Sequence, residues 1–275
     1  MKKIIVIKLG GQVIKEKKYF IPLLEAIVGC VKKGFYVVVI HGGGPQADEM
    51  QIKLGIPMEK VNGKRITNRE TLEVVKMVYR GKINLDIVAD CLKLHIPAVG
   101  ISGVDGGLIL AERRPVANVL DHKTGKKKEV DFGSVGDIKY INTKLLEIIL
   151  KEGYLPVVAC LGVSDMSEIL NINADTFAVH ISLSLKAEKL IFVTDVKGVF
   201  GGSQKYSYEK HLTLGQAKGL ISNGVVSHGM IPKIENVERA LIGGVKTIIV
   251  GQLDTKKKWS DALLNNSHGT VITKN

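Results

Sequence analysis

Two lysines occupy positions where a positive charge is costly unless an anion lies beside it. Lys8 interrupts the apolar run "IIVIKLGG", and a charge inside a buried strand needs a partner. Lys233 follows "HGMIP" near the start of a predicted helix, where its charge opposes the helix dipole. An anionic ligand would stabilise both ammonium groups. The alternative, a surface lysine with its ammonium in water, suits Lys233 better than Lys8.

Glycines gather directly after predicted strands. Gly10 and Gly11 follow the first strand, and Gly42, Gly43 and Gly44 follow "YVVVIH". Backbone N–H groups at such strand-to-helix turns bind phosphates and carboxylates, and the carboxyl ends of parallel strands meet at one edge of a sheet. We therefore expect an anion site at that edge. G-x-x-x-x-G-K-[ST] is absent and "GGGPQA" does not fit G-x-G-x-x-G, which excludes two familiar phosphate motifs.

Three other features allow a functional and a plain structural interpretation. Arg65 in "NGKRITN" could form a forked contact with a carboxylate, or it could be an ordinary surface arginine. Asp175 in "NINADT" could position the two lysines, although its spacing alone favours an N-cap. The segment "FVTDVKGVF" is a strand that runs into a polar turn, which could hold a nucleotide base or ribose, or be only a turn.

The elements that must position these residues alternate between strand and helix. Near-continuous Val/Ile strands between helices predict an α/β fold with a mainly parallel sheet covered on both faces. Thr67 and Glu70 have the spacing of a capping box and open a long predicted helix, which Gly81 is expected to break or kink. Residues 108–140 form short β-like runs, with a hairpin tip at "DHKTGKKK". The best domain boundary lies near Leu155.

Composition excludes several classes of protein. The chain has 275 residues, 45% of them hydrophobic, which is enough for one large domain or two modest ones. No apolar run reaches the length of a membrane span, and the short apolar start is a strand rather than a signal peptide, so we expect a cytoplasmic protein. Three widely spaced cysteines argue against disulfides or zinc. The net charge of +12 fits an anionic partner or solvated lysine-rich faces. No aromatic residues lie among the clustered lysines, which argues against binding of single-stranded nucleic acid by base stacking.

A series of short motifs resembles the amino-acid kinase family, and within it the N-acetyl-L-glutamate kinases. The motifs occur in family order over nearly the whole chain: "KLGG", "HGGGP", "NGKRIT", "GISGVDGG", "FGSVGDI", "NINADT", "TDVKGV" and "GMIPK". The resemblance implies a three-layer α/β/α sandwich around a mostly parallel eight-stranded sheet. It also implies that residues 1–154 bind the acyl amino acid and dimerise, and that residues 155–275 bind MgATP.

The activity implied by the resemblance is transfer of the γ-phosphoryl group of ATP to the γ-carboxylate of N-acetyl-L-glutamate, the second step of arginine biosynthesis. By position, Lys8 and Lys233 match the family's transition-state stabilisers, and Asp175 matches the aspartate that orients them. The positions that match substrate contacts are Gly43, Gly44, Arg65, Asn171 and Asn173. Those that match nucleotide contacts are Gly10, Gly11, Asp195, Val196, Lys197, Gly198, Val199, Phe200, Val225, Val226 and Ser227. Mg²⁺ is expected on the ATP phosphates, with no metal ligands from the protein.

The sequence departs from the family pattern at some positions, and it leaves other functions open. Asn68 stands where many relatives carry an acid, with little expected effect because Asn also caps helices. The first strand begins at Ile4, without the extra helix of arginine-inhibited relatives, which suggests a homodimer without arginine feedback. The nearest rival is a sibling kinase for acetyl-aminoadipate, or for glutamate or aminoadipate on an acidic carrier protein, which the positive charge would suit. A rival of another class is an inactive kinase fold that binds metabolites or nucleic acid.

Overall fold

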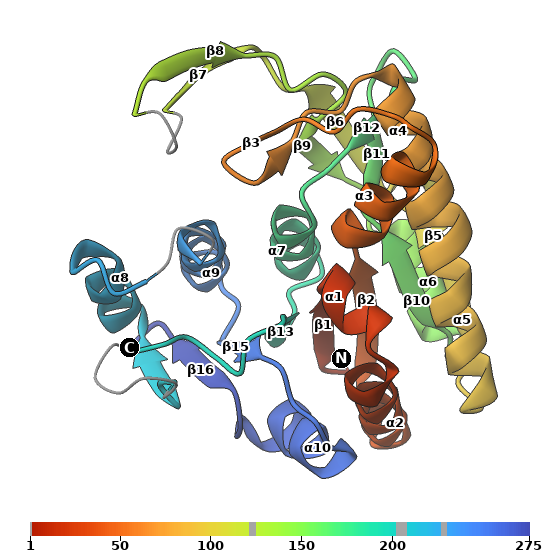
Figure 1. Ribbon diagram of the computed structural model, residues 1–275. Helices are drawn as coiled ribbons and strands as arrows, with labels where there is room; N and C mark the ends of the chain where they lie inside the picture. Colours follow the sequence, from red (N-terminus) through yellow and green to blue (C-terminus); the bar gives the residue numbers. More distant parts are fainter. Residues whose placement is uncertain (1, 121–124, 202–207, 227–229) are drawn as a thin grey trace.

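The computed structural model describes residues 2–120, 125–201, 208–226 and 230–275. At its centre is an eight-stranded sheet (Figure 1), in which all neighbouring strands run parallel except one antiparallel pair at Thr247–Gly251 and Thr270–Thr273. The strands, from one edge to the other, are β14 (His211–Thr213), β16 (Thr270–Thr273), β15 (Thr247–Gly251), β13 (Lys189–Val193), β1 (Ile4–Leu9), β2 (Tyr36–His41), β10 (Leu155–Ala159) and β5 (Ala98–Ser102).

Smaller sheets lie beyond this central one. Four strands form a second sheet in the order β12 (Ile169–Asn171), β11 (Leu161–Val163), β6 (Ile109–Arg113) and β9 (Gly136–Ile141). Two hairpins stand apart, made of β3 (Lys60–Val61) with β4 (Lys64–Arg65) and β7 (Ala117–Leu120) with β8 (Lys127–Val130). The second hairpin confirms the predicted one, and residues 121–124 near its tip lie outside the described residues.

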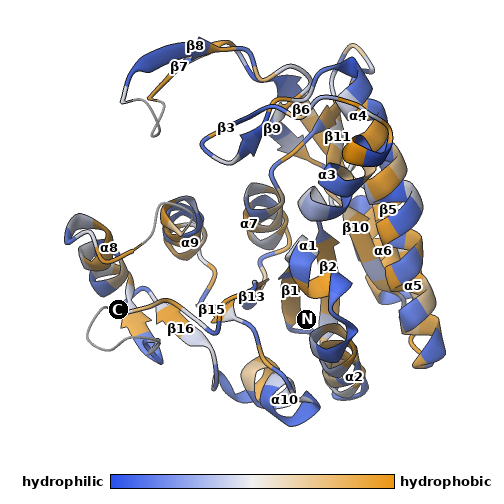
Figure 2. Ribbon diagram, viewed as in Figure 1, coloured by the Kyte–Doolittle hydropathy of each residue, from blue (hydrophilic) through white to orange (hydrophobic). Residues whose placement is uncertain are grey.

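Helices cover both faces of the central sheet, because side chains alternate along each strand and both faces are apolar. Ile5, Ile7 and Leu9 of β1 pack into one core, and Val6 packs into the other. Figure 2 shows these central strands as largely hydrophobic. The helices on the first face are α1 (Gly11–Lys15), α2 (Lys17–Lys32), α3 (Gly44–Lys53), α4 (Arg69–Lys76), α5 (Asn84–Lys93) and α10 (Lys256–Asn265).

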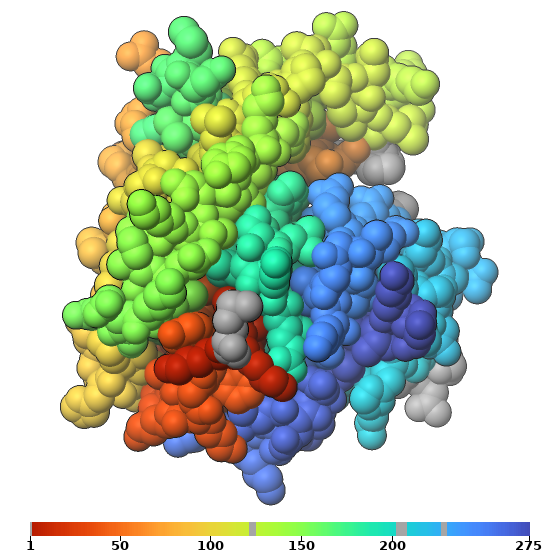
Figure 3. All heavy atoms as spheres, turned by 180° about the vertical axis from the view of Figure 1, so that it is seen from behind, coloured from red at the N-terminus to blue at the C-terminus, as the bar shows by residue number. Residues whose placement is uncertain are grey.

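The opposite face carries the remaining long helices. In the view from behind, the green to blue segments that contain them cover much of the surface (Figure 3). They are α6 (Lys144–Lys151), α7 (Ala174–Ser184), α8 (Leu214–Ser222) and α9 (Ile231–Ile242), and a short 3₁₀ turn, η2, spans Asp105–Gly107. The arrangement is the predicted three-layer α/β/α sandwich around a mostly parallel sheet.

The long helix differs from its prediction at both its start and its middle. The predicted capping box is wrong, because the N-cap is Asn68, whose Oδ1 accepts from the Thr71 backbone N–H at 2.8 Å. Thr67 cannot cap, since its buried Oγ1 accepts from Asn171 Nδ2 at 3.1 Å. Gly81 does not break the helix. The chain runs from α4 through a π-helical segment, η1 (Met77–Ile83), directly into α5.

The predicted domain boundary falls inside the sheet. β10 begins at Leu155 and lies between β2 and β5, so the strands that follow the boundary pair with strands that precede it. The division into two lobes stays a prediction. Cys30, Cys91 and Cys160 are free and buried, and burial raises the pKa of Cys30 to about 11 and that of Cys91 to about 12. In the described part of the chain, no helix is long and apolar enough to cross a bilayer.

Candidate active site

Lys8, Asp175 and Lys233 meet although they are far apart in the sequence. Lys8 lies next to the carboxyl end of β1, and the other two residues lie in the first turns of α7 and α9. Lys8 Nζ is 2.7 Å from Asp175 Oδ1, and Lys233 Nζ donates to Asp175 Oδ2 at 2.8 Å. All three side chains are at most 19% exposed. One carboxylate therefore holds two ammonium groups, and the cluster keeps a net positive charge.

The electrostatics of this cluster favour an additional anion. Burial alone would raise the pKa of Asp175, but Lys8 and Lys233 hold it far below its usual range. Burial and the charge of Lys8 lower the pKa of Lys233, against the opposite influence of Asp175 and Asp195. Lys233 Nζ also lies 5.0 Å from the centre of the Phe192 ring. A phosphate beside the two lysines would relieve their mutual repulsion.

The interpretation of Asp175 as an N-cap is wrong. Asn173 caps α7, with its Oδ1 accepting from the Thr176 backbone N–H at 3.0 Å. Asp175 lies two positions further along, in the first turn, where the helix dipole favours a carboxylate. Its side chain is therefore left to the two lysines.

A cavity of about 540 Å³ opens beside Lys8. Of the predicted residues, it is lined by Lys8, Gly11, Gly43, Gly44, Arg65, Asn171 and Asn173. Its charged lining consists of the cations Lys8, Lys60, Lys64, Arg65, Arg114 and Arg239, against the carboxylates Asp137 and Glu235. A cavity of this size with a surplus of cations suits a small anionic ligand.

The glycines of the two loops have different structural reasons. A Cβ on Gly11 would lie 2.7 Å from the Pro45 ring, and one on Gly43 would lie 2.2 Å from Ile83 and 2.9 Å from the Tyr79 ring. These two glycines are required for packing. A Cβ on Gly44 would meet nothing within 4 Å, so Gly44 leaves its part of the cavity wall open.

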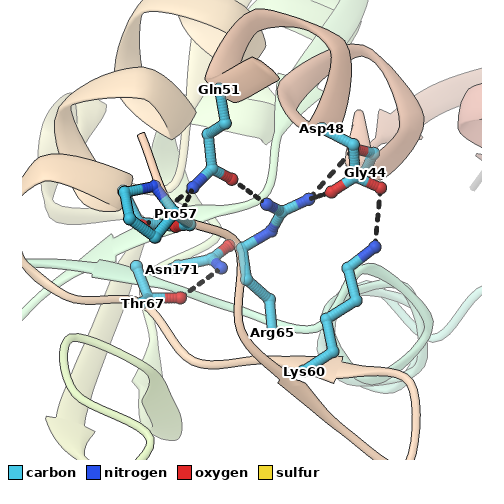
Figure 4. A network of polar contacts seen from close by, with 9 residues as sticks. Gly44, Asp48, Gln51, Pro57, Lys60, Arg65, Thr67 and Asn171 are labelled. Carbon is cyan, nitrogen blue, oxygen red and sulfur yellow. Dashed lines mark hydrogen bonds and ion pairs between the residues drawn. The ribbon is translucent and has the colours of Figure 1, made fainter. Parts of the chain in front are cut away.

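Arg65 is held on α3 by a network of polar contacts (Figure 4). Its Nη2 donates to Asp48 Oδ1 at 2.5 Å and to the Gly44 carbonyl at 3.0 Å, and its Nη1 donates to Gln51 Oε1. Lys60 Nζ contacts the other oxygen of Asp48 at 2.6 Å. Gly44, Asp48 and Gln51 have i, i+4, i+7 spacing, which puts them on one helix face. Sequence reasoning missed Asp48 and Gln51, and this spacing was the available signal.

Other charged residues of the cavity were also missed. Arg114 grips Asp137 with two nitrogens, Nη2 at 2.5 Å from Oδ1 and Nε at 3.1 Å from Oδ2. Asp137 belongs to the motif "FGSVGDI", so the motif identified its segment without identifying the residue. Lys64 likewise belongs to a quoted motif, "NGKRIT". Lys60, Glu235 and Arg239 carry no comparable sequence signal, and only the fold brings them to the cavity.

Most residues predicted to bind the nucleotide do not line this cavity. Residues 195–200 follow β13, with Val199 buried and its N–H donating to Thr270 Oγ1 at 2.8 Å. Val225 is exposed and Val226 is buried, whereas Ser227 lies outside the described residues. Gly10 donates its N–H to the Val193 carbonyl at 2.9 Å. The structure thus gathers the predicted catalytic and acceptor residues, with Asp195 near enough to influence Lys233.

His41 ends β2 directly before the glycine run and is completely buried. Its Nδ1 donates to the Gly42 carbonyl at 2.8 Å, because its Nε2 faces an amide donor from Asn84. Burial, with a contribution from Arg80, lowers the pKa of His41 to about 4. The imidazole is therefore neutral in the folded protein at neutral pH.

This pKa predicts a loss of stability in mild acid. Between pH 6.5 and 4 the unfolded chain takes up a proton on His41 that the folded chain does not, so the free energy of unfolding should fall by about 2 kcal/mol from pH 7 to 5. Urea unfolding at both pH values would measure the loss. His41→Gln should lose less, while His180, whose pKa burial and Arg239 also lower, contributes equally to both proteins. Equal losses in the two proteins would contradict the assignment.

Comparison with known proteins identifies the family of this chain. The sequence model of the amino acid kinase family matches residues 3–251. An acetylglutamate kinase of Methanocaldococcus jannaschii is 41% identical over 274 residues, which are 99% of this chain and 91% of that protein. One of Bacillus licheniformis is 39% identical over 250 residues, 91% of this chain and 90% of that one.

Solved structures agree. The protein smu.665 from Streptococcus mutans UA159 has a TM-score of 0.79 and 28% identity, with both chains fully covered. The N-acetylglutamate synthase of Neisseria gonorrhoeae, complexed with coenzyme A and N-acetyl-glutamate, shares the fold at a TM-score of 0.82 and 22% identity, over 99% of this chain and 60% of that one. Because the family match extends from β1, which carries Lys8, to the end of β15, this chain belongs to the amino acid kinase family.

Proposed function

We propose that this protein uses ATP to phosphorylate the γ-carboxylate of N-acetyl-L-glutamate, giving N-acetyl-L-glutamyl 5-phosphate, the second step of arginine biosynthesis. The observation that carries the proposal is the pair of ammonium groups on Asp175 beside a cationic cavity. The naming of relatives at 41% and 39% identity as acetylglutamate kinases supports the choice of acceptor.

The proposed reaction needs no general base. A glutamate-type carboxyl group has a pKa of about 4.3, so the acceptor is already ionised at neutral pH. Its oxygen forms a bond to the γ-phosphorus, the bond from that phosphorus to the bridging oxygen breaks, and ADP leaves with the electron pair. What remains is to bring two anions together and to stabilise charge on the moving phosphoryl group. Lys8 and Lys233 supply that charge, and Asp175 holds them in place.

We assign the acceptor to the cavity and the nucleotide to the segments that follow β13 and α8. Arg65, Asn171 and the glycine run after β2 line the acceptor side. In the described part of the chain, no three His, Cys, Asp or Glu side chains lie close enough together to hold a metal ion. As the family resemblance implies, Mg²⁺ would lie on the ATP phosphates, where it would neutralise their charge.

The proposal includes the division of labour and the assembly expected from the family. Residues 1–154 would bind the acceptor and form a homodimer, and residues 155–275 would bind MgATP in the cytoplasm. Asn171 and Asn173 line the acceptor cavity from beyond that boundary. The acceptor site therefore draws on both parts of the chain. The central sheet does the same, because β10 of the second part lies between β2 and β5 of the first.

Trapping the acyl phosphate with hydroxylamine tests the function. The purified protein, MgATP and one carboxylic acid at a time would be incubated, and the hydroxamate measured. We expect product with N-acetyl-L-glutamate and little with glutamate or N-acetyl-aminoadipate. If only N-acetyl-aminoadipate gives product, that acid would be the acceptor in place of N-acetyl-L-glutamate. Absence of ATP turnover with every acid would contradict a kinase altogether.

A further inference from the structure

A buried chain of hydrogen bonds lies directly behind the glycine run Gly42–Gly44, and the chemistry above does not use it. Its first link is the His41 Nδ1–H, which donates to the Gly42 carbonyl at 2.8 Å. Its second is Asn84, whose Nδ2 donates to His41 Nε2 at 3.0 Å. Both side chains are completely buried, and neither lines the cavity. The chain therefore touches the loop but not the ligand.

Asn84 is fixed from every side. Its amide nitrogen also donates to the Val157 carbonyl in β10 at 2.9 Å, and its Oδ1 accepts from Arg80 Nη1 at 3.2 Å. A Cβ on Gly100 of β5 would lie only 2.1 Å from Asn84 Oδ1, so a glycine there makes room for the amide. Because both amide N–H groups are engaged, the orientation requires an unprotonated Nε2 on His41. The low pKa of His41 agrees with that tautomer.

The helix that carries Asn84 also packs on the loop itself. Tyr79 and Ile83 occupy the space that a side chain on Gly43 would need, and both belong to the π-helical segment that ends one residue before Asn84. A π turn widens a helix locally and is frequent at functional sites. The wider turn accordingly lies where the helix meets the glycine run.

We propose that Asn84 is a positioning residue for the acceptor: through His41, and with Tyr79 and Ile83 packed on Gly43, it holds the glycine run where the backbone N–H groups meet the acceptor carboxylate. The identity of that acceptor rests on the proposed function. Groups that act through a catalytic loop in this way commonly change activity by 10- to 100-fold when replaced.

The first test is Asn84→Leu, which keeps the volume and removes the donor to His41. We expect kcat/KM for the acceptor to fall roughly 10- to 100-fold while KM for ATP stays within about twofold. Gly100→Ala, which pushes the same amide aside, should reproduce the effect from another strand. Trp259→Phe is the control for lost stability, since it removes the buried hydrogen bond that Trp259 of α10 donates to the Leu253 carbonyl. If Trp259→Phe lowers kcat/KM for the acceptor as much as Asn84→Leu does, the proposal is overturned.

The second test is a pH profile of Asn84→Asp. With a carboxylate at position 84, a neutral His41 can donate its single N–H either to that carboxylate or to the Gly42 carbonyl, and it donates to both only when the imidazole carries a second proton. We therefore expect kcat/KM relative to wild type to fall about tenfold from pH 6 to 9. Arg80, paired with Asp105 at 3.8 Å, faces His41 from the π-helical segment. Lys8 and the Cys160 thiol belong to the opposite face of the sheet. A ratio that does not change with pH would contradict the role of His41.

A third test needs no substrate and separates the two proposals. Hydrogen–deuterium exchange of the peptide that contains Gly42–Gly44 should be faster in Asn84→Leu than in wild type, and unchanged in Trp259→Phe. Faster exchange in a protein that does not phosphorylate N-acetyl-L-glutamate would defeat the proposed function alone. Unchanged exchange and unchanged acceptor KM in an active enzyme would defeat the positioning role alone.

Discussion

Lys8→Met should lower kcat about 10²- to 10³-fold, by analogy with the loss of one donor to a developing oxyanion. The reason lies in the charge of the cluster: with Lys8 gone, Asp175 and Lys233 neutralise each other, and the cluster loses its surplus positive charge. KM for the acceptor should change little, because Arg65 and the glycine run stay in place. Initial rates with both substrates varied would separate kcat from the two KM values.

The chain provides a matched control in Lys189. This lysine is also buried in a central strand, but at the amino end of β13, where its Nζ donates to the Ala262 carbonyl at 3.2 Å and to that of Leu263. Burial lowers its pKa to about 8. Lys189→Met should therefore weaken folding and leave kcat near the wild-type value. Near-normal turnover in Lys8→Met, or an equal loss in Lys189→Met, would show that Lys8 does not act on the phosphoryl group.

The local pattern of the sequence predicted the scaffold well. Apolar runs such as "IIVIKL" and "YVVVI" became adjacent parallel strands. A lysine inside an apolar run was informative for the same reason, since the cost of burying its charge is visible without coordinates. Such features depend on neighbours in the chain, which the sequence contains.

The remaining features depend on contacts between distant segments. Asn68 caps α4 because Thr67 is already bonded to Asn171, more than a hundred residues away in the chain. The π-helical segment continues through Gly81 where a break was expected, and its Tyr79 and Ile83 fill the space over Gly43. The cationic lining at Arg114 and Arg239 comes from elements that approach only after folding. No spacing within one segment contains this information.

Arg65→Ala should raise KM for the acceptor roughly 10- to 100-fold with little change in kcat, as expected when a buried guanidinium that binds a carboxylate is removed. Three of its five N–H donors are engaged by Asp48, Gln51 and the Gly44 carbonyl, and two are left for a ligand. Asp48 would keep Lys60 as a partner in the variant, so the carboxylate is not left unpaired. The effect should therefore appear in binding rather than in folding.

Two companion variants make the Arg65 result specific. Arg65→Lys keeps the charge but loses the planar fork, so its acceptor KM should lie between those of wild type and Arg65→Ala. Arg113→Ala removes an exposed guanidinium paired with Asp131, and should leave KM unchanged. An unchanged acceptor KM in Arg65→Ala would show that this arginine does not bind the acceptor. An equal rise in both KM values would instead indicate that the contacts of Arg65 on α3 support the whole site, because only a distortion shared by both substrate sites would weaken both.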